Sequence, residues 1–171
     1  MSGNIKDTSN PNALVAITTS DSGSAFATTY FKKFFNGVDE HYDTWWIFAD
    51  NENQVYSAMD KVPDRCFTVL AGHGTTQTLT LGNTRNETYT IDVSDNELKD
   101  HLGNSNPGEV ILLASCSTGW GKESLGETIA TITGKKVIAP KRSTSGDELR
   151  VINWVPFDAN WKTPEDTYKS K

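Results

Sequence analysis

His73 and Cys116 are the two residues of this sequence whose types, if brought together, could perform nucleophilic catalysis. Each follows an apolar run, CFTVLAG before His73 and VILLAS before Cys116. An imidazole can accept the proton of a thiol and later protonate a leaving amine, so the pair is suited to attack on a carbonyl. Gly74 leaves room for a substrate carbonyl, and its backbone N–H together with that of Cys116 could form an oxyanion hole.

The two residues meet only if the runs before them are neighbouring parallel strands. From Ala13 onward, short apolar runs alternate with amphipathic stretches, which is typical of an α/β domain. The runs are nearly continuous in apolar residues, as in parallel strands covered on both faces, and span 13–18, 44–49, 66–71, 110–115 and 136–139. Ligands gather at the carboxyl ends of such strands, so we expect His73 and Cys116 at one edge of the sheet.

Three helices are predicted between these runs. The first spans 24–36, with Phe26, Tyr30 and Phe34 four residues apart and Gly37 as its C-terminal stop. The other two begin at capping boxes and end at glycines: Ser94 and Glu97 with Gly103, and Ser124 and Glu127 with Gly134. Residues 148–157 suggest a strand or hairpin.

Length and composition indicate one domain with a sizeable core. The 171 residues carry 16 basic and 22 acidic side chains, and this acidic balance argues against nucleic acid as a partner. No apolar run approaches the roughly 18 residues of a membrane helix, and the polar N-terminus favours a cytoplasmic location or export without a conventional signal peptide. We expect a loose tail over 1–12, the domain over 13–157 and a polar tail over 158–171.

The cysteine and histidine positions restrict the chemistry further. The two cysteines cannot form a disulfide framework or a cysteine zinc site. All three histidines precede Cys116, which excludes the Cys-before-His order of papain-like enzymes and of amidotransferase-type hydrolases. Cys66 opens an apolar run, so core packing is its expected role.

An apolar strand ending in His-Gly, followed by a second ending in a small residue and Cys, resembles the catalytic signature of the caspase-like (clan CD) cysteine peptidases. The run CSTG over 116–119 is similar to the Cys-x-Ser-Gly run of metacaspases, and KRSTS over 141–145 resembles the self-processing cysteine protease domains of bacterial toxins. The match extends as a pattern from about Ala13 to Phe157. It implies a three-layer α-β-α sandwich of the caspase-hemoglobinase fold, and hydrolysis of protein or peptide substrates at a His73/Cys116 dyad without metal or organic cofactor.

The resemblance also implies where substrate would bind. In this group the loop after the first strand and the region behind the cysteine build the pocket for the side chain preceding the cleaved bond. Asp21, in the loop 18–23, would favour Arg or Lys there, although helix capping is the ordinary role of such a residue. Ser115 belongs to the region behind the cysteine.

Further substrate contacts are expected on both sides of the strand predicted over 136–139. Lys141, Arg142 and Ser143 occupy the position where the family pairs its substrate backbone. Trp120 could cover the dyad or pack against the substrate, and ordinary packing is the alternative. A phosphate-loop interpretation of the segment 116–123 fails because Cys116 and Glu123 stand where glycine and Ser or Thr are needed.

Other functions stay open on the same residues. Lys135, Lys136, Lys141 and Arg142 form a basic cluster that could bind a small-molecule polyanion activator, or could be a solvated strand edge. The scaffold could also serve as a non-catalytic interaction module, or the dyad could catalyse another acyl transfer. Neither a nucleic acid nor a membrane is an expected partner.

Overall fold

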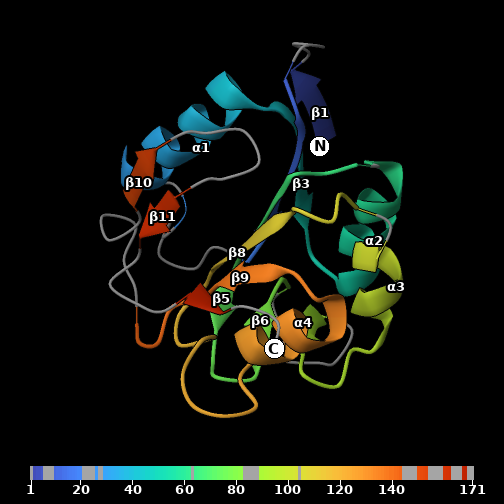
Figure 1. Ribbon diagram of the computed structural model, residues 1–171, viewed down its shortest axis with the longest axis vertical. Helices are drawn as coiled ribbons and strands as arrows, with labels where there is room; N and C mark the ends of the chain where they lie inside the picture. Colours follow the sequence, from blue (N-terminus) through green and yellow to red (C-terminus); the bar gives the residue numbers. More distant parts are fainter. Residues whose placement is uncertain are drawn as a thin grey trace.

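The computed structural model describes residues 2–5, 10–20, 26, 29–62, 64–82, 89–103, 105–143, 150–153, 160–162 and 167–168. A seven-stranded sheet in the order β1-β3-β2-β4-β8-β9-β12 forms its centre (Figure 1). These strands span Ser2–Ile5 (β1), Asn12–Thr18 (β2), Asp43–Ala49 (β3), Phe67–Ala71 (β4), Val110–Ala114 (β8), Lys136–Ile138 (β9) and Thr167–Tyr168 (β12). The strands from β3 to β9 in this order are parallel, whereas β1 and β12 run antiparallel at the edges.

The α/β class and the parallel sheet predicted from the apolar runs are confirmed. All five runs form parallel strands, with ends within one residue of those predicted. Every residue of β4 and β8 is buried, because helices cover both faces of the sheet. Continuous burial explains why these strands lack polar alternation.

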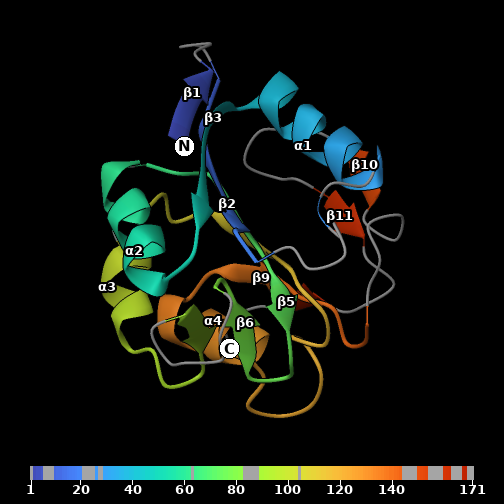
Figure 2. The same ribbon diagram turned by 180° about the vertical axis from the view of Figure 1, so that it is seen from behind.

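The four helices within the described residues form two layers, one on each side of the sheet. They span Thr29–His41 (α1), Glu52–Lys61 (α2), Glu97–Gly103 (α3) and Leu125–Thr133 (α4). The connection from β2 through α1 crosses the sheet in one direction, and the later connections cross in the other. Right-handed crossovers therefore place α1 on one face and the other helices on the opposite face. Figures 1 and 2 show α1 on one side of the sheet and α2 and α3 on the other.

Successive residues of β2 divide between two core clusters, one for each face. Leu14 and Ala16 pack with α2, α3 and α4, whereas Ala13, Val15 and Ile17 pack with α1. The alternating direction of strand side chains produces this division. The layers are therefore helix, sheet and helix.

The predicted C-terminal end of the first helix is wrong. α1 continues through Gly37 to His41, because Val38 in the turn beyond the glycine is fully buried and Tyr42 nearly so. Burying these side chains outweighs the cost of a glycine in a helix, about 1 kcal/mol. Residues 24, 25, 27 and 28 of the predicted helix lie outside the described part of the chain.

The capping predictions have mixed outcomes. Ser124 caps α4 by accepting from the Glu127 N–H, and Gly134 ends this helix with φ of 70°, as predicted. The hydroxyl of Ser94 instead donates to Asp92, so the predicted box does not form at α3. The prediction also missed α2, where Asn51 is the N-cap.

Smaller strands complete the structure. β5 (His73–Gly74), β6 (Thr78–Thr80) and β7 (Thr90–Asp92) form an antiparallel sheet, and β10 (Arg150–Asn153) pairs with β11 (Asn160–Lys162) as a hairpin. The segments predicted as tails contain β1, β11 and β12, and the domain boundaries stay predictions. None of the described helices has the length and apolar character needed to cross a membrane.

Candidate functional site

The parallel register brings His73 and Cys116 to equivalent positions at the carboxyl edge of the sheet. The last paired residues of β4 and β8 are Ala71 and Ala114. The Gly72 N–H extends the ladder by donating to the Ala114 carbonyl at 3.3 Å. His73 and Cys116 each lie two residues beyond the last pair, so the strands deliver both to the same edge.

The backbone of Gly74 is packed against the residues around the cysteine. A Cβ atom at Gly74 would lie 2.0 Å from Oγ of Ser115 and 2.8 Å from the carbonyl oxygen of Cys116. It would also lie 3.0 Å from Cγ2 of Thr118. Only a glycine permits this approach, which places the two predicted motifs in direct contact.

His73 is half-buried, and two different elements hold it. Its backbone belongs to β5, where it pairs with Thr80 of β6. Its ring meets the ring of Phe26 edge-on, with centroids 5.8 Å apart. The buried atoms His73 Nε2 and Ser115 Oγ have no hydrogen-bond partner within the described residues. Buried polar atoms are normally hydrogen-bonded, so both are candidates to bind a substrate or exchange a proton.

The loop after Cys116 is fixed by the segment that follows β9. Ser117 has φ of 59°, a conformation that costs a non-glycine residue on the order of 1–3 kcal/mol. Its N–H donates to the Arg142 carbonyl at 3.0 Å, and the Gly119 N–H donates to the Pro140 carbonyl at 2.7 Å. The hydroxyl of Thr118 donates to the Ser115 carbonyl at 3.2 Å. These bonds hold the half-buried cysteine at the start of a strained turn.

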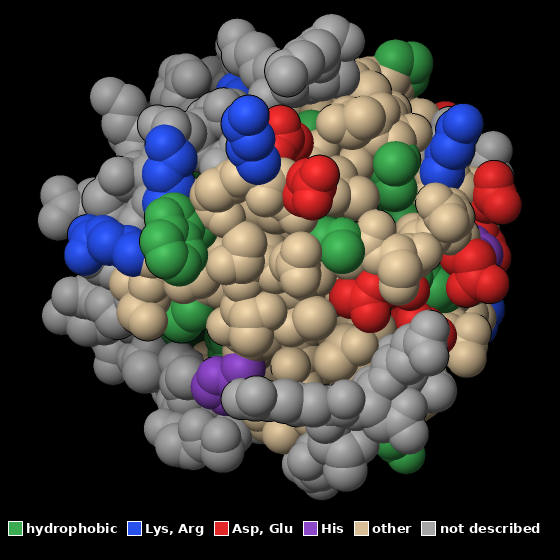
Figure 3. Space-filling model, turned by 90° about the horizontal axis from the view of Figure 1, so that it is seen from below, with side chains coloured by type: hydrophobic (Ala, Val, Ile, Leu, Met, Phe, Trp, Pro, Cys, Tyr) green, Lys and Arg blue, Asp and Glu red, His purple; other side chains and the backbone are tan. Residues whose placement is uncertain are grey.

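The predicted substrate-contact residues beside this loop are exposed. Trp120 is 63% exposed, and Lys141, Arg142 and Ser143 all reach the surface next to the cysteine turn. Figure 3 views the molecule from the end where β5 and β6 lie, and basic side chains gather with hydrophobic ones on one side of this face. The structure thus brings four of the predicted contact residues close to the segment that follows Cys116.

Two other predicted residues have different outcomes. Asp21 lies outside the described residues, so its role stays a prediction. Lys135 does not contribute to a surface cluster, because its side chain is 5% exposed and forms a 3.2 Å ion pair with buried Glu109. Of the four residues of the predicted cluster, Lys136, Lys141 and Arg142 remain candidates to bind an anionic activator.

Cys66 behaves as the sequence predicts and differs from Cys116. It is 3% exposed in the core, and burial, followed by the charges of Glu109 and Asp64, raises the pKa of its thiol to about 11. Such a thiol is almost fully protonated near neutral pH. Cys66 therefore provides an internal reference for the reactivity of Cys116.

Sequence patterns missed part of this site. The four-residue spacing of Phe26 from Tyr30 predicts a place on a helix face. It does not indicate the contact between Phe26 and His73. Ser115 belongs to the predicted site, but its contact with the backbone of Gly74 was missed. The backbone bonds from the segment after β9 were also missed, because they join segments that are far apart in sequence. Among the described residues, no group of three or more His, Cys, Asp or Glu side chains could hold a metal ion.

One known protein family matches the part of the chain that contains this site. A family described as a domain of unknown function (DUF8616) matches residues 43–150, more than half of the chain. The chain belongs to this family. The DUF8616 match runs from the start of β3 to the start of β10 and includes both His73 and Cys116. No curated protein matches the chain.

Proposed function

We propose that this DUF8616 protein is a cysteine endopeptidase of the caspase-like type, with Cys116 as nucleophile and His73 as general base and acid. The observation that carries the proposal is the shared register of the two residues beyond the paired ends of β4 and β8. The contact of Gly74 with Ser115 and Cys116 supports it, because this contact aligns the motifs on one small surface.

In this mechanism the proton of the Cys116 thiol passes to His73, and the sulfur attacks a peptide carbonyl carbon. A carbon–sulfur bond forms while the N–H groups of Gly74 and Cys116 stabilise the oxyanion. The carbon–nitrogen bond then breaks as His73 returns the proton to the leaving amine. Water hydrolyses the thioester and restores the thiol.

The fold is compatible with this proposal. The chain reverses direction across the sheet between β2 and β4, and ligands in open α/β sheets bind at the carboxyl ends beside such a reversal. His73 lies two residues beyond the end of β4. The helix layers on both faces and the mostly parallel sheet are compatible with the three-layer sandwich that the motif resemblance implies.

A peptide library analysed by mass spectrometry tests the activity. We expect the wild-type protein to cleave a subset of peptides and Cys116→Ala to lower the rate by at least about 10³-fold with an unchanged unfolding midpoint. Adding an amine nucleophile separates hydrolysis from acyl transfer, since transfer would give amide products. Equal turnover by Cys116→Ala and the wild type would remove the mechanism.

Alkylation by iodoacetamide tests the dyad without a substrate. We expect Cys116 to react faster than Cys66 near neutral pH, and His73→Ala to slow the reaction of Cys116. His41→Ala is the matched control, because His41 lies at the end of α1 and its Nδ1 contacts the Gly37 carbonyl. A Cys116 rate that is the same in wild type and His73→Ala would contradict the pairing.

A further inference from the structure

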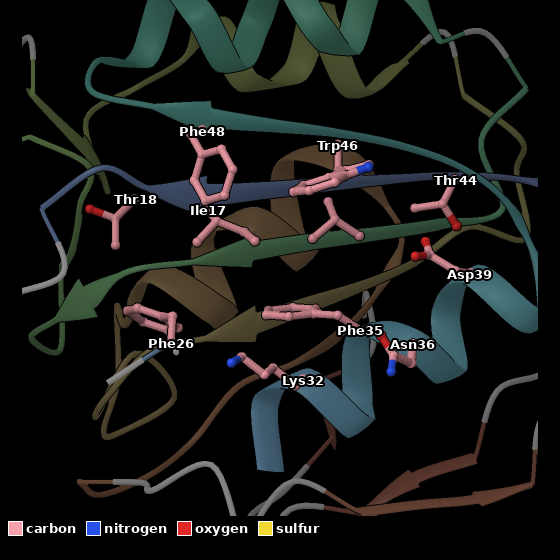
Figure 4. Close-up of a pocket in the computed structure, with 11 residues that line it drawn as sticks. Ile17, Thr18, Phe26, Lys32, Phe35, Asn36, Asp39, Thr44, Trp46 and Phe48 are labelled. Atoms are coloured by element: carbon pink, nitrogen blue, oxygen red, sulfur yellow. The ribbon is translucent and has the colours of Figure 1, made fainter. Parts of the chain in front are cut away.

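A pocket of about 410 Å³ lies between α1 and the strands β2 and β3 (Figure 4). This volume falls within the range of small-ligand sites, which is roughly 300–1,000 Å³. Most of the wall is apolar and comes from Val15, Ile17, Phe26, Phe35, Trp46 and Phe48. Such a wall suits an uncharged apolar group.

The pocket reaches the candidate active site through Phe26. This ring lines the pocket and also meets the His73 ring edge-on at 5.8 Å. Thr18 and Phe48, at the carboxyl ends of β2 and β3, lie at the same end of the pocket as Phe26 (Figure 4). A group bound at this end would therefore be close to the edge of the sheet that carries His73.

The charged residues that line the pocket disfavour a basic side chain at the end where Phe26 lies. Asp39, near the C-terminal end of α1, lies at the opposite end of the pocket beside Thr44 (Figure 4). Partial burial raises the pKa of the Asp39 carboxyl, while the hydrogen bond with Thr44 lowers it. The charged lining residue nearer to Phe26 is Lys32, whose ammonium points toward that ring and would repel a Lys or Arg side chain.

Aromatic surface at the mouth of the pocket is left in contact with water. Phe48 is 45% exposed, and its ring lies edge-on to half-buried Trp46 with centroids 5.5 Å apart. Burying this surface under an apolar group would be favourable, by about 25 cal/mol for each Å² covered.

We propose that this pocket binds an apolar side chain of the peptide substrate, aliphatic or aromatic, near the bond that Cys116 cleaves. The proposal rests on the proposed peptidase function and adds a substrate class to it. Under this proposal, the substrate residue directly before the cleaved bond would bind at the loop that contains Asp21, and not in this pocket. The pocket would select for an apolar residue at a neighbouring substrate position.

Binding is tested apart from catalysis in the Cys116→Ala variant. The probe is N-phenyl-1-naphthylamine, a neutral aromatic dye that fluoresces in apolar sites, and the competitors are capped peptides with Leu or Phe against matched peptides with Lys. We expect saturable dye binding that Leu and Phe peptides displace and Lys peptides do not. Adding Phe48→Lys should weaken dye and peptide binding by about 10-fold, whereas Phe48→Leu should preserve both.

Cleavage provides the second measurement. In the peptide library, wild-type protein and Phe48→Leu should favour substrates with an apolar residue near the cleaved bond, and Phe48→Lys should lose this preference. Unfolding midpoints of the two Phe48 variants check that they remain folded. If apolar peptides displace the dye but the wild type cleaves nothing, the peptidase proposal fails and the peptide site stands. Dye binding that no peptide displaces, or cleavage without apolar preference, would overturn the pocket proposal.

Discussion

Gly74 shows how a single position can link both halves of the candidate site. Its missing side chain lets the backbone after His73 lie against Ser115 and Cys116. We expect Gly74→Ala to lower kcat/KM by at least about 10-fold and the unfolding free energy by about 1–3 kcal/mol, because the backbone carbonyl at 2.8 Å must move. Library cleavage rates and urea unfolding measure the two effects.

Two further variants separate crowding from the general effect of removing a glycine. In Gly108→Ala the new Cβ would lie 3.3 Å from the side-chain oxygen of Asn106, so stability should change by less than about 0.5 kcal/mol. Adding Ser115→Ala to Gly74→Ala removes the closest contact and should restore part of the stability. Full activity in Gly74→Ala would contradict the close packing of the two motifs.

For single residues, the sequence predicted the positions of the side chains that lie at strand ends. His73 and Cys116 reach one edge because each lies two residues beyond the paired end of a recognisable strand, so the register determines their position. Lys135 could not be predicted in the same way. Its pairing with Glu109 joins segments that are far apart in sequence, and no local pattern distinguishes it from its exposed neighbours.

A buried ionic network holds the amino ends of β4 and β8 in register, at the end of the sheet opposite to the candidate site. Glu109, which precedes β8, forms ion pairs with Arg65 at 3.3 Å and with Lys135 at 3.2 Å, and it accepts hydrogen bonds from Thr68 and Ser105. All five side chains are buried. The network therefore fixes the shared register that delivers His73 and Cys116 to one edge.

Removing the carboxylate charge of Glu109 should lower the unfolding free energy more than removing the charge of Lys135. Glu109→Gln leaves both Arg65 and Lys135 without a buried counter-charge, and we expect a loss of about 3–5 kcal/mol in unfolding free energy. Lys135→Met leaves the Arg65–Glu109 pair intact and should cost less than half as much. Urea unfolding of both variants measures the difference. A larger loss in Lys135→Met would show that Arg65 contributes little to holding Glu109.

The turn between β7 and α3 should make stability depend on pH. Burial, followed by the charges of Asp92 and Glu97, raises the pKa of Asp95 to about 6, while the Asp92 N–H lowers it by donating to the Asp95 carboxylate. A carboxyl whose folded pKa is raised stabilises the fold below its unfolded pKa, and this contribution is lost as pH rises through about 6.

Asp95→Asn keeps the hydrogen-bond acceptor and removes the titration. We expect the variant to exceed the wild type in unfolding free energy by about 1 kcal/mol near neutral pH, a value that allows for solvent screening at this half-buried site. The difference should disappear below about pH 4. Urea unfolding across this pH range tests it. A constant difference at all pH values would exclude the titration of Asp95 as the cause.

Secondary structure was predictable where the local signals agreed, and the prediction failed where tertiary burial competed with local propensity. The parallel strands and the cap at Ser124 each combine several agreeing signals. Gly37 predicts the end of the helix, but α1 continues because the helix buries Val38, the next residue. The small sheet β5–β7 was also missed, because its strands of two or three residues are too short to show a period.

The whole molecule combines a rigid centre with a more loosely held functional edge, and hydrogen exchange should separate the two. β2, β4 and β8 pair on both sides between the two helical layers, so their amides should exchange only through global unfolding, at similar slow rates. The turn over 117–120 is tied mainly by single bonds to the segment after β9, and it should exchange through smaller openings. Peptide-level hydrogen–deuterium exchange of Cys116→Ala measures both regions. The destabilised Glu109→Gln variant is the control: it should accelerate the central strands together and bring them nearer to the rate of the turn. If β8 exchanged much faster than β2 in either protein, the sheet would not be one cooperative unit, and the edge carrying His73 and Cys116 would lack the rigid support that its register requires.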